Sequence, residues 1–136
     1  MSDLTRPERP IHRNIHISQI IAYRLPAAGV LSILHRVSGA LMFLAIPFVL
    51  YLFDRSLTSA GTFGEFKAVA SSWWAKLVLL VLIWSYLHHS VAGIRHLFMD
   101  VHIGLDITSG RQTALVVFAV SLVLWLACAL KMFGAF

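Results

Sequence analysis

Three histidines and an arginine lie close together in residues 88–96, whose sequence is HHSVAGIRH. A neutral imidazole can bind a metal, form hydrogen bonds, or exchange a proton near neutral pH. The apolar lead-in from Leu77 to Leu87 is about 17 Å long as a helix, which is short of the roughly 30 Å hydrocarbon core of a bilayer. The histidines must therefore continue a membrane span, where ionisable side chains are costly and mark a site by default.

The composition places the whole chain in a membrane. Of its 136 residues, 59% are hydrophobic and only 12% are charged, and the mean hydropathy of +0.81 is too high for a soluble domain of this size. Three apolar runs, residues 27–53, 73–98 and 113–133, are each long enough to cross a bilayer as a helix. We expect an all-α integral membrane protein with three transmembrane helices in one domain, residues 27–136, after an amphipathic or interfacial segment, residues 1–26.

Positive charges near the ends of the spans indicate an orientation. With the N-terminus in the cytoplasm, six basic residues lie on the inner side and four on the outer side, which the positive-inside rule favours. The inner residues are Arg6, Arg9, Arg13, Arg24, Arg95 and Arg111, and the outer residues are Arg55, Lys67, Lys76 and Lys131. We therefore interpret the net charge of +5 as an orientation signal, and expect no nucleic-acid partner.

Depth in the membrane links the histidine segment to the first span. Arg36 lies nine residues after Ala27, where that span begins, and His89 lies nine residues before Phe98, where the second span ends. Both positions are then about 13 Å inside the same face of the membrane. The two sequences can meet.

Helical phase selects the side chains that share a face, at about 100° per residue. On the second span, this face contains His89, Gly93, His96 and Asp100. The corresponding face of the first span contains Ser32, Arg36 and Gly39, and His35 lies one residue away from this face around the helix. The small residues let helices or a flat ligand approach closely, so a planar cofactor fits between the spans.

A b-type haem suits this arrangement, because it needs an axial histidine for its iron, apolar walls, and basic groups near its propionates. His89 is the candidate ligand. The alternative is a histidine that only forms a hydrogen bond to a neighbouring helix. His88 lies about 100° away from the shared face and is expected to face a partner helix or the haem edge. The remaining histidines are expected at the membrane interface; they are His12, His16 and His102.

Two motifs carry a resemblance to a known family. Residues 32–39, SILHRVSG, are followed about fifty residues later by HSVAGIRHLFMD at 89–100. Together they closely resemble the cytochrome b membrane-anchor subunit of bacterial succinate dehydrogenase, in respiratory complex II. The tail from Arg9 to Pro26 is similar to that family's amphipathic lead-in. The match covers about residues 10 to 100.

The resemblance implies a haem b with His89 as one axial ligand to the iron and a second, smaller anchor subunit supplying the other. It implies that His35, Arg36 and His96 meet the haem propionates, and that Ser32 and Arg36 contribute to a ubiquinone pocket. It also implies a multi-pass protein of the bacterial inner membrane that partners an iron–sulfur subunit and a flavoprotein subunit. From the residues alone, both axial ligands could also come from this chain, as His35 with His89.

Electrons must be delivered by another chain. The single cysteine, Cys128, cannot hold an iron–sulfur cluster, and the sequence contains no Gly-rich dinucleotide fingerprint. We therefore expect a subunit of a succinate:quinone oxidoreductase that is not catalytic alone. At a quinone site, the Ser32 hydroxyl and the Arg36 cation would bond the quinone carbonyls and stabilise negative charge as the quinone is reduced. An ordinary serine that bonds its own helix is the alternative for Ser32.

Two other functions stay open at this point. The chain could anchor a fumarate reductase, or it could be a haem-free quinone-binding scaffold. A small transporter is disfavoured, because no acidic residue lies near the middle of any span to form an ion path.

Overall fold

The structure, a computed structural model, describes residues 16, 18 and 25–134. These residues form four helices and no strand: α2 (Ala27–Thr58), α3 (Ala60–Ser71), α4 (Trp73–Asp100) and α5 (Ile107–Met132). Helices α2, α4 and α5 are long and apolar enough to cross a membrane, with mean hydropathies of 1.9, 1.8 and 2.5 in their most apolar windows. The expected all-α architecture with three spanning helices is confirmed. The predicted N-terminal interfacial segment lies almost wholly outside the described residues.

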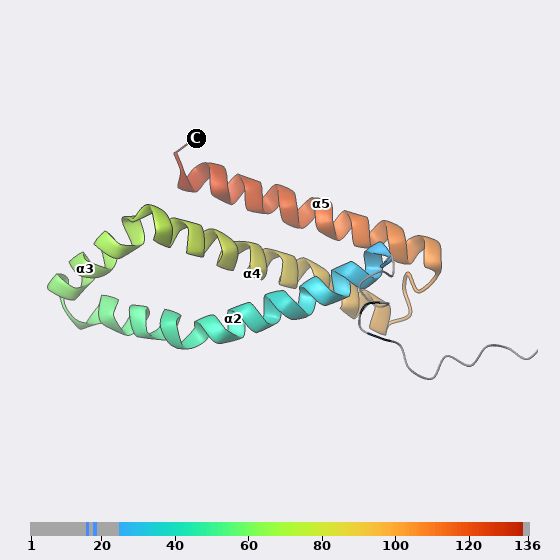
Figure 1. Cartoon of the computed structure of the whole chain (residues 1–136), viewed down its shortest axis with the longest axis horizontal. Coiled ribbons are helices and arrows are strands. Elements are labelled where there is room, and N and C mark those ends of the chain that lie inside the picture. The colour runs from blue at the N-terminus through green and yellow to red at the C-terminus, as the bar shows by residue number, and fades with distance from the viewer. Residues whose placement is uncertain (1–15, 17, 19–24, 135–136) are drawn as a thin grey trace, which may run out of the picture.

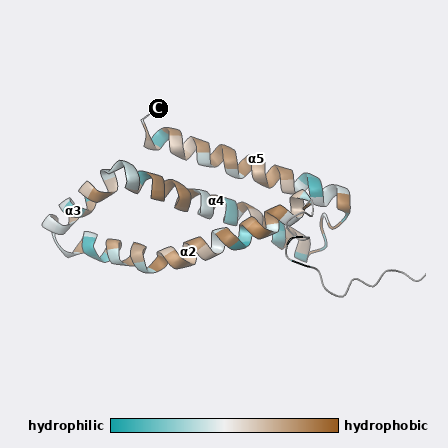
Figure 2. Cartoon of the chain, viewed as in Figure 1, coloured by the Kyte–Doolittle hydropathy of each residue, from teal (hydrophilic) through white to brown (hydrophobic). Residues whose placement is uncertain are grey.

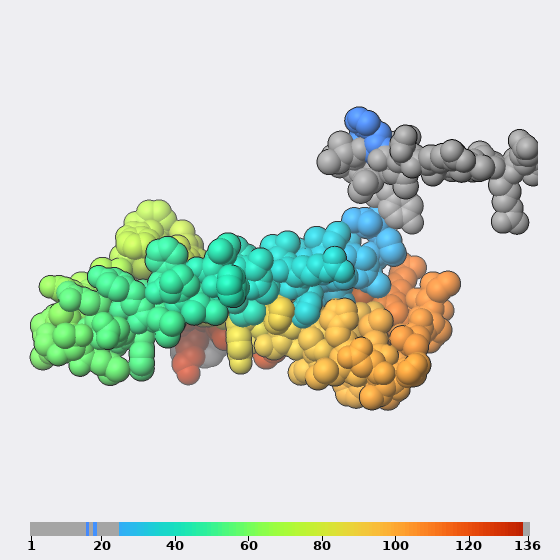
Figure 3. All heavy atoms as spheres, turned by 90° about the horizontal axis from the view of Figure 1, so that it is seen from below, coloured from blue at the N-terminus to red at the C-terminus, as the bar shows by residue number. Residues whose placement is uncertain are grey.

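Helix α4 lies between α2 and α5 (Figure 1), and it contacts both. Helices α2 and α4 are close together at one end and separate toward the other, where the short helix α3 joins them (Figure 1). Helix α2 is continuous through Pro47, which lacks a backbone hydrogen-bond donor, and it bends along its length (Figure 1). The end where the three long helices meet, seen with all atoms in Figure 3, carries His35, His89 and His96.

The buried apolar core is small and lies at this meeting point. Its members come from all three long helices and are Leu31, Ala92, Ala114 and Val117. The two alanines allow the backbones to approach closely. Most other large apolar side chains are exposed, so the long helices present apolar faces, and Figure 2 shows that hydrophobic residues recur along each of these helices. Such faces are expected where helices meet lipid or the helices of another subunit.

Each of the three long helices extends beyond its apolar run in the sequence at one end. Helix α2 continues to Thr58 rather than ending near residue 53, and α5 begins at Ile107 rather than 113. Hydropathy marks where an apolar run ends, but polar residues do not stop a helix. Asp106 caps α5, because its side chain accepts a hydrogen bond of 2.8 Å from the backbone N–H of Ser109. Helix α4 begins at Trp73, as expected, and ends at Asp100, two residues beyond the prediction.

Helix α3 occupies the segment expected to be a loop between the first two spans. Ser59 and Thr62 start it with reciprocal bonds: the Ser59 hydroxyl accepts from the Thr62 N–H at 3.1 Å, and the Ser59 N–H donates to the Thr62 hydroxyl at 3.0 Å. This is a capping box with Thr in place of the usual Glu or Gln. Arg55 of α2 also forms an exposed ion pair of 3.4 Å with Glu65 of α3.

The turn after α4 depends on a histidine in the left-handed conformation. His102 has φ 64°, and its N–H donates to the Met99 carbonyl at 2.9 Å while the Ile103 N–H donates to the Phe98 carbonyl at 3.0 Å. This pair of bonds is the Schellman pattern that ends helices, usually with Gly at this position. His102 is exposed, and its backbone ends the helix that carries His88, His89 and His96.

Candidate functional site

His89 of α4 is bonded to the backbone of α2. Its Nδ1 lies 2.9 Å from the carbonyl oxygen of His35, and 3.3 Å from the hydroxyl of Ser38. The Ser38 hydroxyl itself donates to the same His35 carbonyl at 2.8 Å. Two segments 54 residues apart in the sequence therefore meet, as the estimate of depth predicted.

These bonds determine where the proton of the His89 ring lies. A carbonyl oxygen can only accept, so Nδ1 of His89 must carry the hydrogen and donate it to His35. In the neutral ring, the lone pair is then on Nε2. No hydrogen bond among the described residues involves that Nε2. The ring therefore donates through one nitrogen and leaves the other without a hydrogen-bond partner among the described residues, as metal-binding histidines in proteins commonly do.

Gly39 allows this approach. A Cβ atom at position 39 would lie 2.9 Å from Cε1 and 3.2 Å from Nδ1 of the His89 ring. Real Cβ atoms essentially never come within 3.0 Å of another heavy atom in this way, so a side chain at position 39 would force the His89 ring to shift. Gly93, on the opposite helix, is less restricted, because a Cβ there would only contact Nε2 of His35 at 3.7 Å.

His35 and His96 extend the cluster toward the end of α4. The His35 ring stacks on the His89 ring, with 4.0 Å between centroids and 13° between planes. The His96 ring is tilted by 54° relative to the His35 ring, and their centroids are 4.9 Å apart. The structure thus brings together all three histidines that the sequence selected.

Ser32 and Arg36 do not take part in this network. Ser32 is half-buried and Arg36 is exposed, and neither side chain makes a hydrogen bond or ion pair within the described part of the chain. The face of α2 that meets α4 instead follows Leu31, His35 and Ser38, at i, i+4 and i+7. Arg36 is about 100° away from His35 on the helix, so its guanidinium points off the α2–α4 interface.

His88 faces the opposite side of α4. It is 1% exposed, and its ring stacks between Trp84 and Phe118, at centroid distances of 5.2 and 5.7 Å. Its Nδ1 lies 3.3 Å from the hydroxyl of Ser121, which donates its own hydrogen to the Phe118 carbonyl at 3.2 Å. His88 therefore packs against α5, one of the two locations that the sequence left open.

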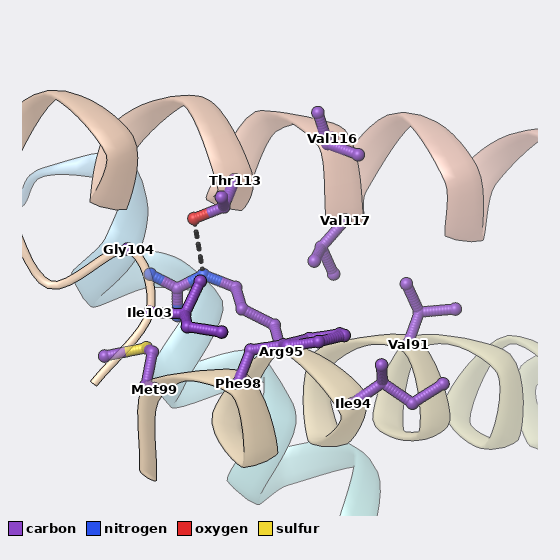
Figure 4. Close-up of a pocket in the computed structure, with 10 residues that line it drawn as sticks. All are labelled: Val91, Ile94, Arg95, Phe98, Met99, Ile103, Gly104, Thr113, Val116 and Val117. Carbon is purple, nitrogen blue, oxygen red and sulfur yellow. Dashed lines mark hydrogen bonds between the residues drawn. The ribbon is translucent and has the colours of Figure 1, made fainter. Parts of the chain in front are cut away.

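Arg95 is a buried interhelical residue, which the sequence interpretation missed by counting it only as an orientation charge. It is 8% exposed, and its guanidinium donates to the Thr113 hydroxyl at 2.9 Å and the Gly110 carbonyl at 3.2 Å. Figure 4 shows the side chain reaching from α4 toward Thr113, beside an apolar groove of about 420 Å³. The predicted third span began at residue 113, so the preceding turn, whose Gly110 carbonyl accepts one of these bonds, was not anticipated.

The described residues contain no cluster of three or more His, Cys, Asp or Glu side chains that could hold a metal ion. A metal at His89 would therefore need other ligands, such as a prosthetic group or another chain. Fold and site together define a class: a small three-span membrane protein that presents one oriented imidazole inside the bilayer, near the end of its helices.

Comparison with known proteins places the chain within this class. Residues 5–128 match the family described as succinate dehydrogenase/fumarate reductase transmembrane subunit. Three relatives carry the name succinate dehydrogenase cytochrome b556 subunit. The one from Paracoccus denitrificans is 32% identical over 91% of this chain and 92% of its own. The one from Coxiella burnetii is 36% identical over 74% and 82%, and the one from Rickettsia felis is 28% identical over 75% and 79%.

The chain belongs to the family of succinate dehydrogenase and fumarate reductase transmembrane subunits. The resemblance inferred from the two sequence motifs is thereby confirmed.

Proposed function

We propose that this chain is the membrane-anchor subunit of a succinate dehydrogenase, that it binds haem b, and that it helps to form the site of ubiquinone reduction. Its relatives named above are all succinate dehydrogenase cytochrome b556 subunits, which favours this function over the anchor of a fumarate reductase. As an anchor of this family, it would hold an iron–sulfur subunit and a flavoprotein subunit at the membrane.

The geometry of His89 is the observation that carries the haem proposal. Its Nδ1–H is bonded to the His35 carbonyl at 2.9 Å, and its Nε2 is left to coordinate iron. Gly39 provides the space for the ring. When bound, the haem supplies a one-electron carrier within the membrane. His35, His96 and Arg36 lie on the same end of the helices, and we assign them to the region of the haem propionates.

We assign the second axial ligand to another, smaller anchor subunit. His35 and His89 stack face to face at 4.0 Å, whereas two axial ligands must point their nitrogens at one iron from opposite sides. This stacking argues against the pair as joint ligands. The exposed apolar faces of the three long helices provide surface for the second subunit.

Ser32 and Arg36 are assigned to the quinone. Arg36 has no carboxylate partner among the described residues, and an unpaired arginine within a span costs a few kcal/mol on insertion scales. A quinone carbonyl that gains negative charge on reduction would offer this cation a charge-assisted hydrogen bond. The Ser32 hydroxyl, one turn earlier on α2, would donate a second hydrogen bond.

The visible spectrum of the purified complex tests this proposal. The reduced-minus-oxidised spectrum should show a b-type haem, His89→Ala should remove or perturb it, and His88→Ala should leave it nearly intact. The two adjacent histidines thus serve as matched controls for each other. A wild-type complex without haem would support a haem-free scaffold instead, and the reverse pattern between the two variants would overturn the assignment of the ligand.

We also propose that the protein lies in the bacterial inner membrane, with the turn between α4 and α5 in the cytoplasm and α3 on the outer side. Cysteine labelling tests this in a Cys128→Ser background. Leu105, in the turn, and Gly64, in α3, are both exposed, so each is replaced by cysteine in turn, as Leu105→Cys and Gly64→Cys. In intact cells, an impermeant reagent should label position 64 and spare position 105. Strong labelling at 105 would contradict the orientation.

A further inference from the structure

Ser38 and Gly39 are two adjacent small residues of α2 beside the ring of His89; the proposed function gives Gly39 only the provision of space and gives Ser38 no role. Ser38 is completely buried, and its hydroxyl lies 3.3 Å from Nδ1 of His89. Gly39 lies beside the same edge of the ring, where a Cβ would approach Cε1 and Nδ1. Both residues therefore act on the nitrogen that carries the proton.

The hydrogen bonds around this nitrogen form a closed arrangement. The Ser38 hydrogen is directed to the His35 carbonyl, at 2.8 Å, so the Ser38 oxygen can only accept from Nδ1–H of His89. The Nδ1–H is then shared between two oxygens, the nearer one being the His35 carbonyl at 2.9 Å. Acceptors on the distal N–H of a ligating histidine fix its tautomer and raise the basicity of the coordinating nitrogen.

We infer that Ser38 and Gly39 are positioning residues that set the midpoint potential and the binding of the haem through the Nδ1–H of His89. This inference rests on the proposed role of His89 as an axial ligand. Gly39 lets the ring reach the His35 carbonyl, and Ser38 holds the ring at that carbonyl with a second acceptor. A more basic imidazole donates more charge to the iron and stabilises its oxidised form. Weakening these bonds should therefore raise the midpoint potential of the haem and loosen its binding.

Gly39→Ala is the stronger of two test variants. The new methyl group would push the His89 ring away from its carbonyl acceptor, so the Nδ1–H would lose its main hydrogen bond. We expect the affinity for haem to fall at least about tenfold, the lower end of the 10- to 100-fold losses seen when such partners are removed. A tenfold loss of preference for the oxidised iron corresponds to a rise of about 59 mV in a one-electron couple.

Ser38→Ala removes the second, longer acceptor together with the hydroxyl's own bond to the His35 carbonyl, and it leaves the nearer acceptor in place. The potential should therefore shift in the same direction by a smaller amount. Ser38→Thr keeps the hydroxyl and should restore the wild-type potential. Two matched controls should leave the potential unchanged. Ser85→Ala removes a completely buried serine that only bonds its own helix at 2.8 Å, and Gly29→Ala adds a methyl group to α2 at ordinary contacts of 3.6 Å or more.

The experiment is a spectroelectrochemical titration of the assembled complex, with haem content measured on the same samples. A raised potential in Gly39→Ala and Ser38→Ala, with wild-type values in Ser38→Thr and both controls, supports the inference. Wild-type potentials in both test variants overturn it. If Gly39→Ala does not assemble, the inference is tested by comparing the midpoint potentials of Ser38→Ala and Ser38→Thr. Equal potentials in these two variants would also overturn it.

The proposed function fails in a different way from this inference. It fails if the wild-type complex contains no haem, or if His89→Ala retains the wild-type spectrum. If His89→Ala loses the haem but Ser38→Ala and Gly39→Ala keep the wild-type midpoint potential, only the proposed role of Ser38 and Gly39 is wrong.

Discussion

The two sides of helix α4 carry adjacent histidines in different environments. On the side of α5, His88 is enclosed between two aromatic rings, and its Nε2 is buried without a hydrogen-bond partner in the described part of the chain. On the side of α2, His89 is only half-buried, its Nδ1 is bonded to a backbone carbonyl, and its Nε2 makes no hydrogen bond within the described residues. An imidazole can serve as a ligand only where its second nitrogen faces an opening, so the enclosed ring is a packing element.

The α4–α5 side is also the more completely bonded of the two. Besides the His88 contact, Arg95 bonds the first turns of α5, and the indole N–H of Trp125 donates to the Leu80 carbonyl at 2.9 Å. These contacts lie near the two ends and the middle of α4. They hold the helix in one rotational position, which keeps His89 directed at α2.

The comparison implies that changes on the α2 side alter redox chemistry, whereas changes on the α5 side alter stability. Arg36→Leu should give the largest effect. Losing a hydrogen bond from a charged group costs about 1.5–3 kcal/mol, so quinone-dependent succinate oxidation should fall about 10- to 100-fold. Ser32→Ala removes a neutral donor, worth about 1 kcal/mol, and should reduce the rate about fivefold.

The matching assay uses an artificial dye that accepts electrons upstream of the membrane subunits. Dye reduction should be unchanged in both variants, and Arg111→Leu, which removes another exposed arginine near the same end of the helices, should affect neither assay. Equal losses with quinone and dye would indicate an assembly defect. Full quinone activity would remove Arg36 and Ser32 from the site.

On the α5 side, His88→Ala should lower the thermal stability of the complex without removing haem. It leaves a cavity between Trp84 and Phe118, which we expect to cost about 2–3 kcal/mol. Ser121→Ala keeps the His88 ring and removes the hydroxyl, with its bond to the ring and its bond to the Phe118 carbonyl of its own helix. The effect should be smaller, because interhelical bonds of this kind contribute about 0.6 kcal/mol in membranes. The thermal midpoint and the visible spectrum are measured on the same samples. Loss of haem in His88→Ala at a temperature where the complex stays folded would contradict the expectation that changes on the α5 side alter only stability.

The smallest effect is expected at the start of α5, outside the spans. The backbone N–H of Ser109 donates to the Asp106 carboxylate and holds the pKa of Asp106 below its usual value. A lowered pKa stabilises the folded state above the ordinary Asp pKa of about 3.9, and this contribution is lost as the pH falls through the folded value. Asp106→Asn keeps an N-cap that does not titrate.

The measurement is the difference in thermal midpoint between wild type and Asp106→Asn at pH 7 and near pH 3. All other carboxylates cancel in this difference. The advantage of the wild type should shrink at the lower pH, and a constant difference would contradict the role of the carboxylate.

The sequence by itself determined the membrane class, the three spans and the meeting of His35 with His89. These depend on hydropathy and on the fixed rise of a helix, which are local properties. Helical phase also placed His88 off the face that carries His89, but it selected Arg36 for the inner face of α2, where the structure has Ser38 and His35. Phase gives the angles between side chains on one helix, and not the rotation of that helix against its neighbour.

Only the tertiary structure decided the proton position on His89, the need for Gly39 and the burial of Arg95. Each depends on distances between atoms of different helices, set by how closely and at what angle the helices pack. The sequence did not predict helix α3 or the early start of α5, because the spans were read from hydropathy. A hydrogen bond from a backbone N–H to the side chain of Ser59 or Asp106 starts a helix without changing the hydropathy of the segment. The segments that form the site could therefore be predicted from the sequence. The atoms of α2 that orient the His89 ring could be identified only from the packing of the helices.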